Sequence, residues 1–187
     1  MHNLKTITAL GGSEPRVDTF DHVTIGENDG LALASVAARL GSEDKCRSHL
    51  QDLLGAVPAP DQAILHDPEA GFWMAPEQWM VGAPKETHEL LADDLKARFG
   101  SSASVTEQSG AWVCFDLTGP GMADVTERLC AAPIRKMEAG DVRRTVIHQL
   151  GCFVIRRADQ HHLRILGPRA SADTLHHALI TAAHSTG

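Results

Sequence analysis

Three times in this chain an apolar, strand-like segment runs into a glycine and a proline ahead of a helix-like segment. These passages are Met80-Val81-Gly82-Ala83-Pro84, Asp116-Leu117-Thr118-Gly119-Pro120 and Ile165-Leu166-Gly167-Pro168. Glycine lets the chain bend away from a strand, and proline suits the first turn of a helix, where its missing N–H costs nothing. Hairpins and helices in this order predict an α+β fold, with antiparallel or mixed sheets covered by helices on one face. The similarity of the first and third passages suggests two ferredoxin-like halves.

Hydrophobic periodicity locates the elements between these passages. Helices are predicted over residues 31–40, 42–55, 85–99, 120–130 and 171–184. Strands are predicted over residues 23–25, 71–76, 78–82, 103–108, 111–117, 143–150, 152–157 and 162–166. In the helix over 42–55, Ser42 is the expected N-cap and Gly55 the expected stop. The last three strands are expected to connect through turns at Gly151 and at Asp159-Gln160.

The length of 187 residues suits one domain, or two very small ones, and a folded chain of this size would bury roughly 70% of its extended surface without covalent staples. Residues 1–21 are predicted to form an N-terminal arm, and residues 22–187 a single compact α+β domain. No apolar run approaches the ~18 residues needed to span a bilayer. Residues 1–12 contain one lysine and no sustained apolar region, so no secretory signal is visible, and a cytoplasmic protein is expected.

The charge is polarised along the chain. Residues 1–95 carry 6 basic and 16 acidic side chains, whereas residues 96–187 carry 11 basic and 8 acidic ones. The basic excess is concentrated between Arg135 and Arg169, which suits an anionic ligand, an acidic partner surface or only a solvated basic face. Nucleic acid is disfavoured because the net charge is −7 and the chain has no tyrosine for base stacking.

The possible phosphate, metal and nucleophile motifs are all weak. Gly119-Pro120-Gly121 lies between a strand and a helix, but Asp124 would repel a phosphate and Pro120 lacks an amide, so a simple turn is favoured. Several of the 11 histidines cluster late in the chain, without the spacing of a metal site: His161, His162, His176, His177 and His184. We therefore predict no metal ligand, no cofactor-binding residue and no catalytic residue in this chain.

Other reactive side chains also have structural interpretations. The four cysteines are far apart and are expected to be reduced and mostly buried: Cys46, Cys114, Cys130 and Cys152. Asp93-Asp94 and Glu43-Asp44 are expected on solvated helix faces. Trp73 and Trp79 could be core residues or subunit-interface anchors.

Five segments resemble the gamma subunit of heterotetrameric sarcosine oxidase over about residues 20–184. They are residues 31–39, 72–81, 116–120, 129–130 and 167–172. The gamma subunit is in turn similar to the folate-binding domain of glycine-cleavage aminomethyltransferases. This resemblance implies an interlocked ferredoxin-like fold, in agreement with the layout above.

The resemblance implies a structural subunit of an assembly that oxidatively demethylates sarcosine to glycine. Oxygen is reduced to hydrogen peroxide, and the one-carbon unit passes to tetrahydrofolate. In this family FAD, FMN, NAD, zinc and tetrahydrofolate belong to the other subunits, so this chain is expected to bind none of them. The implied partners are the alpha, beta and delta subunits, with alpha as the main contact.

One departure from the aminomethyltransferases concerns chemistry. Where they carry an acidic pair near a strand, residues 151–157 of this chain contain no Asp or Glu. The resemblance therefore implies the fold without folate chemistry. Two alternatives stay open, a free-standing folate-binding module and a gamma-like subunit of a related N-methyl amino acid dehydrogenase.

Overall fold

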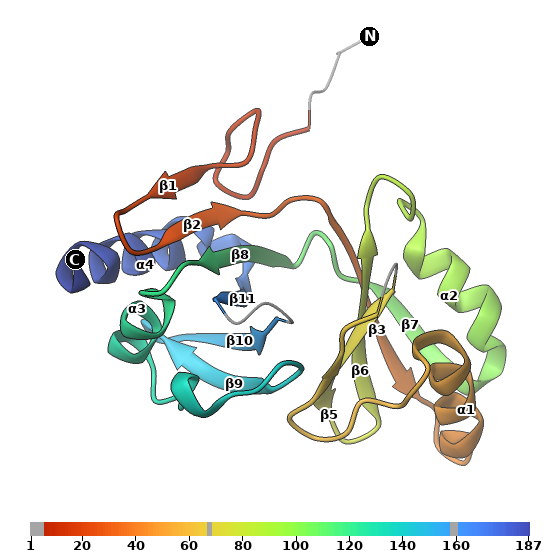
Figure 1. The fold of residues 1–187 in the computed structure, drawn as a ribbon. Coiled ribbons are helices and arrows are strands. Elements are labelled where there is room, and N and C mark those ends of the chain that lie inside the picture. The colour runs from red at the N-terminus through yellow and green to blue at the C-terminus, as the bar shows by residue number, and fades with distance from the viewer. Residues whose placement is uncertain (1–5, 67–68, 158–160) are drawn as a thin grey trace, which may run out of the picture. The chain divides into compact units, whose positions relative to one another are not determined.

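The computed structural model describes residues 6–66, 69–157 and 161–187. The chain forms two compact units, each with its own antiparallel sheet and its own helices (Figure 1). The first unit comprises Met1–Asp29, Ala111–Ala139 and Arg143–Gly187, and the second comprises Gly30–Gly110 and Gly140–Val142. The predicted α+β fold is confirmed.

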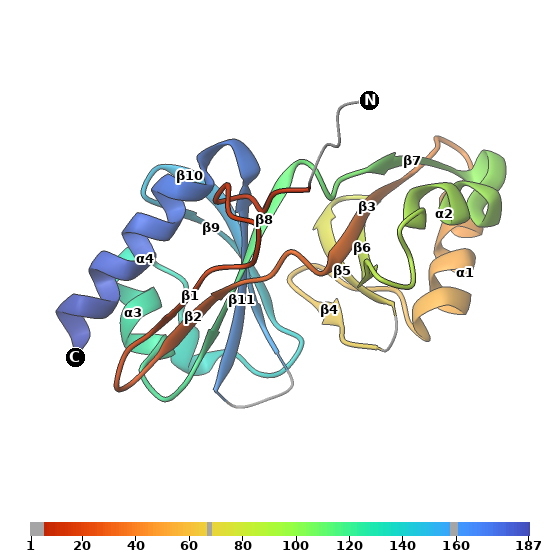
Figure 2. The same ribbon diagram turned by 90° about the horizontal axis from the view of Figure 1, so that it is seen from above.

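The sheet of the first unit has six strands in the order β1-β2-β8-β11-β10-β9. Their bounds are β1 Val17–Thr19, β2 Thr24–Glu27, β8 Trp112–Thr118, β9 Val142–Ile147, β10 Leu150–Arg156 and β11 His162–Pro168. Helices α3 (Met122–Leu129) and α4 (Ala172–Thr186) cover the same face of this sheet (Figure 2). The core between them includes Phe115 and Ile165 from the strands and Leu175 and Leu179 from α4.

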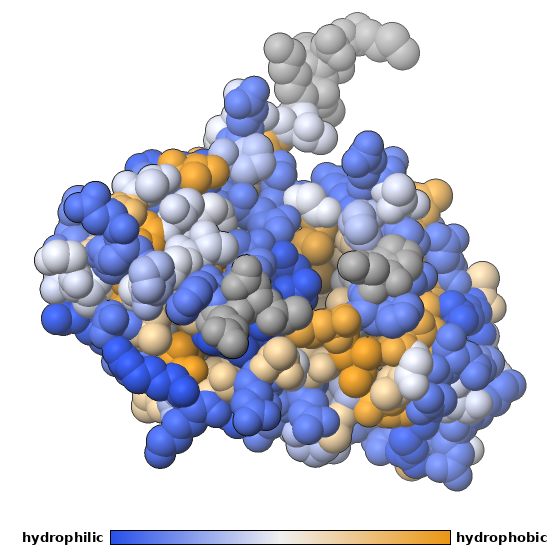
Figure 3. All heavy atoms as spheres, viewed as in Figure 1, coloured by the Kyte–Doolittle hydropathy of each residue, from blue (hydrophilic) through white to orange (hydrophobic). Residues whose placement is uncertain are grey.

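The second unit has five strands in the order β4-β5-β6-β3-β7. Their bounds are β3 Leu31–Ala38, β4 Ala63–Ile64, β5 Ala70–Ala75, β6 Gln78–Pro84 and β7 Ala103–Glu107. Helices α1 (Glu43–Leu54) and α2 (Leu91–Phe99) pack their apolar sides on the sheet. This unit carries 6 Lys and Arg against 13 Asp and Glu, and the outward side of α1 and α2 is mostly hydrophilic (Figure 3).

The helix predicted over residues 31–40 is wrong, because this segment is the strand β3. It pairs with β6 on one side and β7 on the other, so both of its edges are hydrogen-bonded. Ala32, Ala34 and Val36 face the core under the helices, while Leu33 is also buried. A strand buried on both faces appears in the sequence as a nearly continuous apolar run. Periodicity alone cannot distinguish such a run of alanines and leucines from a buried helix.

Two smaller predictions also fail. Helix α2 begins at Leu91 rather than residue 85, because the amides of Thr87 and His88 bond to the carbonyl of Pro84 in turns. The turn between β9 and β10 is His148-Gln149, both with positive φ, and not Gly151, which lies inside β10. Two such residues match the twist of a tight hairpin. The predicted turn at Asp159-Gln160 lies outside the described residues.

The other predicted elements are confirmed within a few residues, but the glycine-proline passages differ from their expected role. Pro84 ends β6 and Pro168 ends β11, so neither lies in a helical turn. Gly167 lies within β11, where a Cβ would approach Leu175 Cδ2 of α4 to 2.5 Å. Of the three glycines only Gly119, with φ +115°, has the positive φ of a bend.

Residues 6–21 belong to the first unit, and Glu27 is one of the residues that attach them to it. The carboxylate of Glu27, only 6% exposed, accepts hydrogen bonds from the amides of Leu10 (3.0 Å) and Arg16 (3.2 Å). Val17–Thr19 adds an edge strand by pairing with β2. A buried acid that is satisfied by backbone donors therefore fixes the path of this segment.

Replacing Glu27 with alanine is expected to release residues 8–16 from the first unit. Losing the carboxylate leaves two backbone N–H groups without their acceptor. Each unsatisfied group destabilises the attached state of the segment by about 1–3 kcal/mol. Hydrogen exchange read by mass spectrometry should show faster exchange in this segment and unchanged exchange in α1. The matched control is Glu14→Ala, at an exposed position. Equal protection in wild type and Glu27→Ala would contradict this assignment.

Among the described residues, no helix has the length and apolar character needed to cross a membrane.

Candidate functional site

A cluster of charged and polar side chains lies on the sheet of the first unit, centred on Asp116. Asp116 in β8 stands opposite Arg164 in β11. Both guanidinium contacts, from Nε to Oδ1 and from Nη2 to Oδ2, are 2.8 Å long. Asn28 donates to Oδ2 at 2.8 Å, and His162 Nε2 lies 3.1 Å from Oδ1 without meeting hydrogen-bond geometry. The side chains of Asp116 and Arg164 are 19% and 13% exposed.

The electrostatics of this cluster favour the charged pair. Burial by itself would raise the pKa of Asp116, but the hydrogen bonds from Arg164 and Asn28, the nearby imidazole of His162 and the charge of Arg164 outweigh it and lower the pKa well below its ordinary value. Burial would likewise lower the pKa of Arg164, and Asp116 reverses this. A carboxylate held ionised by a bidentate guanidinium is a poor general base at neutral pH, so the cluster suits a structural role.

The cysteines agree with the prediction of reduced, mostly buried thiols. All four are free, and only Cys130 is not fully buried. Burial raises the pKa of Cys46 and of Cys152 to about 11 and that of Cys114 to about 12. These three thiols are therefore protonated and unreactive at neutral pH.

The late histidines are dispersed by the fold. His176 is buried, and its Nε2 lies 2.8 Å from Oδ2 of Asp18. His184 packs edge-on against Phe20, with ring centroids 4.9 Å apart, and His177 is exposed. Across the described residues, no group of three or more His, Cys, Asp or Glu side chains converges as a metal site would require.

The acidic pairs and tryptophans also receive structural roles. Asp44 pairs with Arg47, and Asp93 pairs with Lys96, all on exposed sides of α1 and α2. Trp79 is buried, and its indole N–H donates to the carbonyl of Pro58 at 3.0 Å. Trp79 is therefore a core residue, with Trp73 as its cross-strand partner in the β5–β6 hairpin.

The Gly119-Pro120-Gly121 turn is shaped by close packing. The amide of Gly121 donates to the carbonyl of His22 at 2.8 Å. A Cβ at Gly119 would lie 2.7 Å from that same oxygen, and a Cβ at Gly121 would lie 2.1 Å from the His22 ring. The carboxylate of Asp124 is bound by Arg135. Both glycines are thus explained by the approach of the His22 backbone and ring, in agreement with the simple turn predicted from the sequence.

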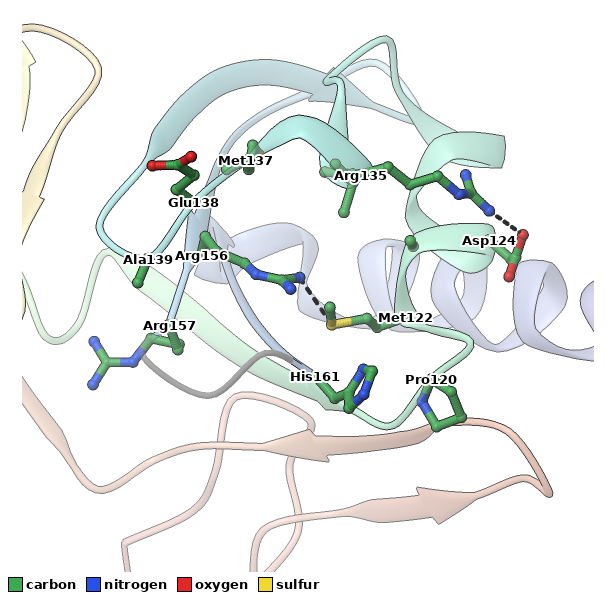
Figure 4. Close-up of a pocket in the computed structure, with 12 residues that line it drawn as sticks. Pro120, Met122, Asp124, Arg135, Met137, Glu138, Ala139, Arg156, Arg157 and His161 are labelled. Carbon is green, nitrogen blue, oxygen red and sulfur yellow. Dashed lines mark hydrogen bonds and ion pairs between the residues drawn. The ribbon is translucent and has the colours of Figure 1, made fainter.

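A pocket of about 670 Å³ lies in the first unit beside this turn. Its walls come from the start of α3, from residues 134–139 and from the adjoining ends of β10 and β11 (Figure 4). Met122, Ile134 and Met137 are its buried apolar residues, at 3%, 0% and 5% exposure.

The charged side chains of the pocket differ in direction. Arg156 extends into the pocket, where Nη1 lies 3.6 Å from Sδ of Met122, whereas Arg157 points away from it (Figure 4). Arg135 is turned toward Asp124 and Glu127. One guanidinium, that of Arg156, therefore reaches the centre of the pocket.

Sequence reasoning missed both the Asp116 cluster and this pocket. The available signal for the cluster was a charged residue inside an apolar strand, as in Val113-Cys114-Phe115-Asp116-Leu117 and Leu163-Arg164-Ile165-Leu166. Buried charges need partners, so each predicts the other. The pocket had no comparable signal, because its walls come from three separate segments.

Comparisons with known proteins establish the fold. No protein-family model matches the sequence, and no curated protein matches it. A chain of the heterotetrameric sarcosine oxidase from Corynebacterium sp. U-96, solved with pyrrole 2-carboxylate, superposes with a TM-score of 0.76 at 22% identity, covering 88% of this chain and 85% of that chain. The glycine cleavage system aminomethyltransferase T from Bartonella henselae superposes with a TM-score of 0.64 at 18% identity, covering 85% of this chain and 45% of that one. This chain shares their α+β fold.

Proposed function

We propose that this chain is a small non-catalytic subunit of a heterotetrameric sarcosine oxidase, in the position of the gamma subunit. The observation that carries the proposal is the large share of both chains that superposes in the comparison with sarcosine oxidase. The superposition spans 88% of this chain and 85% of the sarcosine oxidase chain, so most of each chain corresponds to the other. In the aminomethyltransferase the same fold is less than half of a longer chain.

In this role the chain would contribute structure and not chemistry. The described residues support this, because the three buried thiols are protonated and the Asp116 carboxylate is bound by Arg164. The proposed assembly demethylates sarcosine to glycine, forms hydrogen peroxide and passes the one-carbon unit to tetrahydrofolate. FAD, FMN, NAD, zinc and tetrahydrofolate would be held by the alpha, beta and delta subunits, with alpha as the main partner of this chain.

The test is purification of the tagged chain from its source, with an untagged strain as control. We expect it to elute with larger chains, with a flavin spectrum and with sarcosine-dependent hydrogen peroxide formation. The re-purified single chain should be colourless and inactive. Elution as a lone monomer without flavin, or turnover by the single chain, would contradict the proposal.

The same purified sample distinguishes the proposed function from two related ones. The shared fold with an aminomethyltransferase favours, as a second candidate, a free-standing folate-binding module. It predicts saturable folate binding by the isolated chain. A gamma-like subunit of an N-methyl amino acid dehydrogenase would instead co-elute with a flavoprotein that reduces an artificial acceptor and forms no peroxide.

A further inference from the structure

The pocket of the first unit has the dimensions of a small-molecule site. Its volume of about 670 Å³ lies within the roughly 300–1,000 Å³ range of ligand pockets. Met122, Ile134 and Met137 provide a buried apolar base. Thioethers are polarizable and make favourable contacts with aromatic rings, so this base suits a flat apolar group.

Arg156 supplies the polar contact at the centre of this pocket. Its guanidinium points inward and lies 3.6 Å, through Nη1, from Sδ of Met122 (Figure 4). A thioether sulfur is a weak acceptor, whereas a carboxylate forms short, charge-assisted bonds with guanidinium. A guanidinium carries five N–H donors, so Arg156 can keep protein partners and still donate to an anion.

The surrounding charges select for one negative charge on the ligand. The lining contains three arginines against Asp124 and Glu138, together with His161 on the rim. Of the arginines, Arg135 binds Asp124 and Glu127, and Arg157 points away from Arg156. The three arginines and two carboxylates of the lining leave a net charge of one positive, so a monocarboxylate is better compensated than a doubly charged phosphate.

We propose that this pocket binds a small monocarboxylate with a flat apolar body, its carboxylate on Arg156 and its body against Met122 and Met137. The site belongs to this chain alone and is independent of the proposed subunit role. It would give a chain without catalytic chemistry a ligand of its own.

The test uses the full chain with ¹³C-labelled methionine methyl groups, titrated with 2-naphthoate. The methyl signals of Met122 and Met137 should shift saturably, while those of Met74 and Met80 in the second unit should not. The uncharged analogue 2-naphthylmethanol and inorganic phosphate are the matched ligands, and both should bind at least roughly tenfold more weakly. The alcohol loses the charged hydrogen bond to Arg156, and phosphate has no apolar body to bury. Equal or tighter binding of either analogue would overturn the assignment, as would the absence of saturable shifts.

Variants link the binding to Arg156. Arg156→Gln should weaken 2-naphthoate binding roughly 10- to 100-fold, the effect of losing a charged hydrogen bond. Arg128→Gln removes the same charge from the exposed side of α3, outside the pocket lining, and should leave affinity unchanged. If Arg156→Gln does not fold, Arg156→Lys keeps the charge and loses the bidentate geometry, so it should also weaken binding. Unchanged affinity in the folded Arg156 variant would refute the site.

Discussion

Arg164→Ala is expected to lower the free energy of unfolding by about 3–5 kcal/mol, the usual cost of removing one partner from a buried ion pair. The variant leaves Asp116 largely buried without its bidentate guanidinium, and Asn28 and His162 cannot replace two 2.8 Å contacts. Urea denaturation at neutral pH measures the loss. The control is Arg144→Ala on the exposed part of β9, where the guanidinium lies 5.9 Å from the centre of the Phe153 ring. This variant should lose about 1 kcal/mol or less.

The pH dependence provides a second readout of the same pair. The folded state lowers the pKa of Asp116 below its ordinary value, so the stability from this group is present above about pH 4 and is lost as the pH falls further. Arg164→Ala removes the main group that lowers this pKa, so the variant should lose less stability than wild type between about pH 4 and 2. A variant with wild-type stability and an unchanged acid profile would show that the pair contributes little.

Gly119→Ala is expected to lower the free energy of unfolding by roughly 3 kcal/mol, from the strain of a positive φ and a backbone collision. Gly119 has φ +115°, and its added Cβ would lie 2.7 Å from the His22 carbonyl oxygen and 3.2 Å from Val23 Cα. Neither obstacle is a flexible side chain, so relief requires the backbone before β2 to move. That movement would also weaken the 2.8 Å bond from Gly121 to His22.

The matched control is Gly151→Ala in the same unit. Gly151 has no positive φ, and a Cβ there meets nothing within 4 Å. This substitution should be neutral or stabilising by about 0.4–1 kcal/mol, because alanine restricts the unfolded chain. Thermal melts of both variants test whether Gly119→Ala lowers the melting temperature and Gly151→Ala does not. Similar melting temperatures for the two would mean that the His22 backbone yields easily and that Gly119 is not required.

Local signals were sufficient for most elements of the fold. Helix α1 was predictable because Cys46, Leu50, Leu53 and Leu54 form one apolar stripe that stops at Gly55, whose φ is +77°. The β5–β6 hairpin was predictable from two short apolar runs around one turn. The expected N-cap was correct only in position, since the Ser42 side chain makes no capping bond.

The candidate sites were less accessible to sequence reasoning than the helices. Asp116 and Arg164 are 48 positions apart, and only the pairing of β8 with β11 brings them together. The pocket depends on how residues 120–124 and 134–139 pack against Arg156, Arg157 and His161. No local sequence pattern predicts these contacts between distant residues, because they follow from the order of strands in the sheet.

The α+β class, the helix–turn signals and the burial of the thiols follow from the amino-acid sequence, since they depend on the periodicity and polarity of neighbouring residues. Three features became evident in the folded chain: residues 31–38 form a strand, Gly119 is required by the His22 backbone, and Arg156 points into a pocket. Strand pairing and close packing join residues far apart in the chain, and their energies outweigh local propensities of less than about 1 kcal/mol per residue.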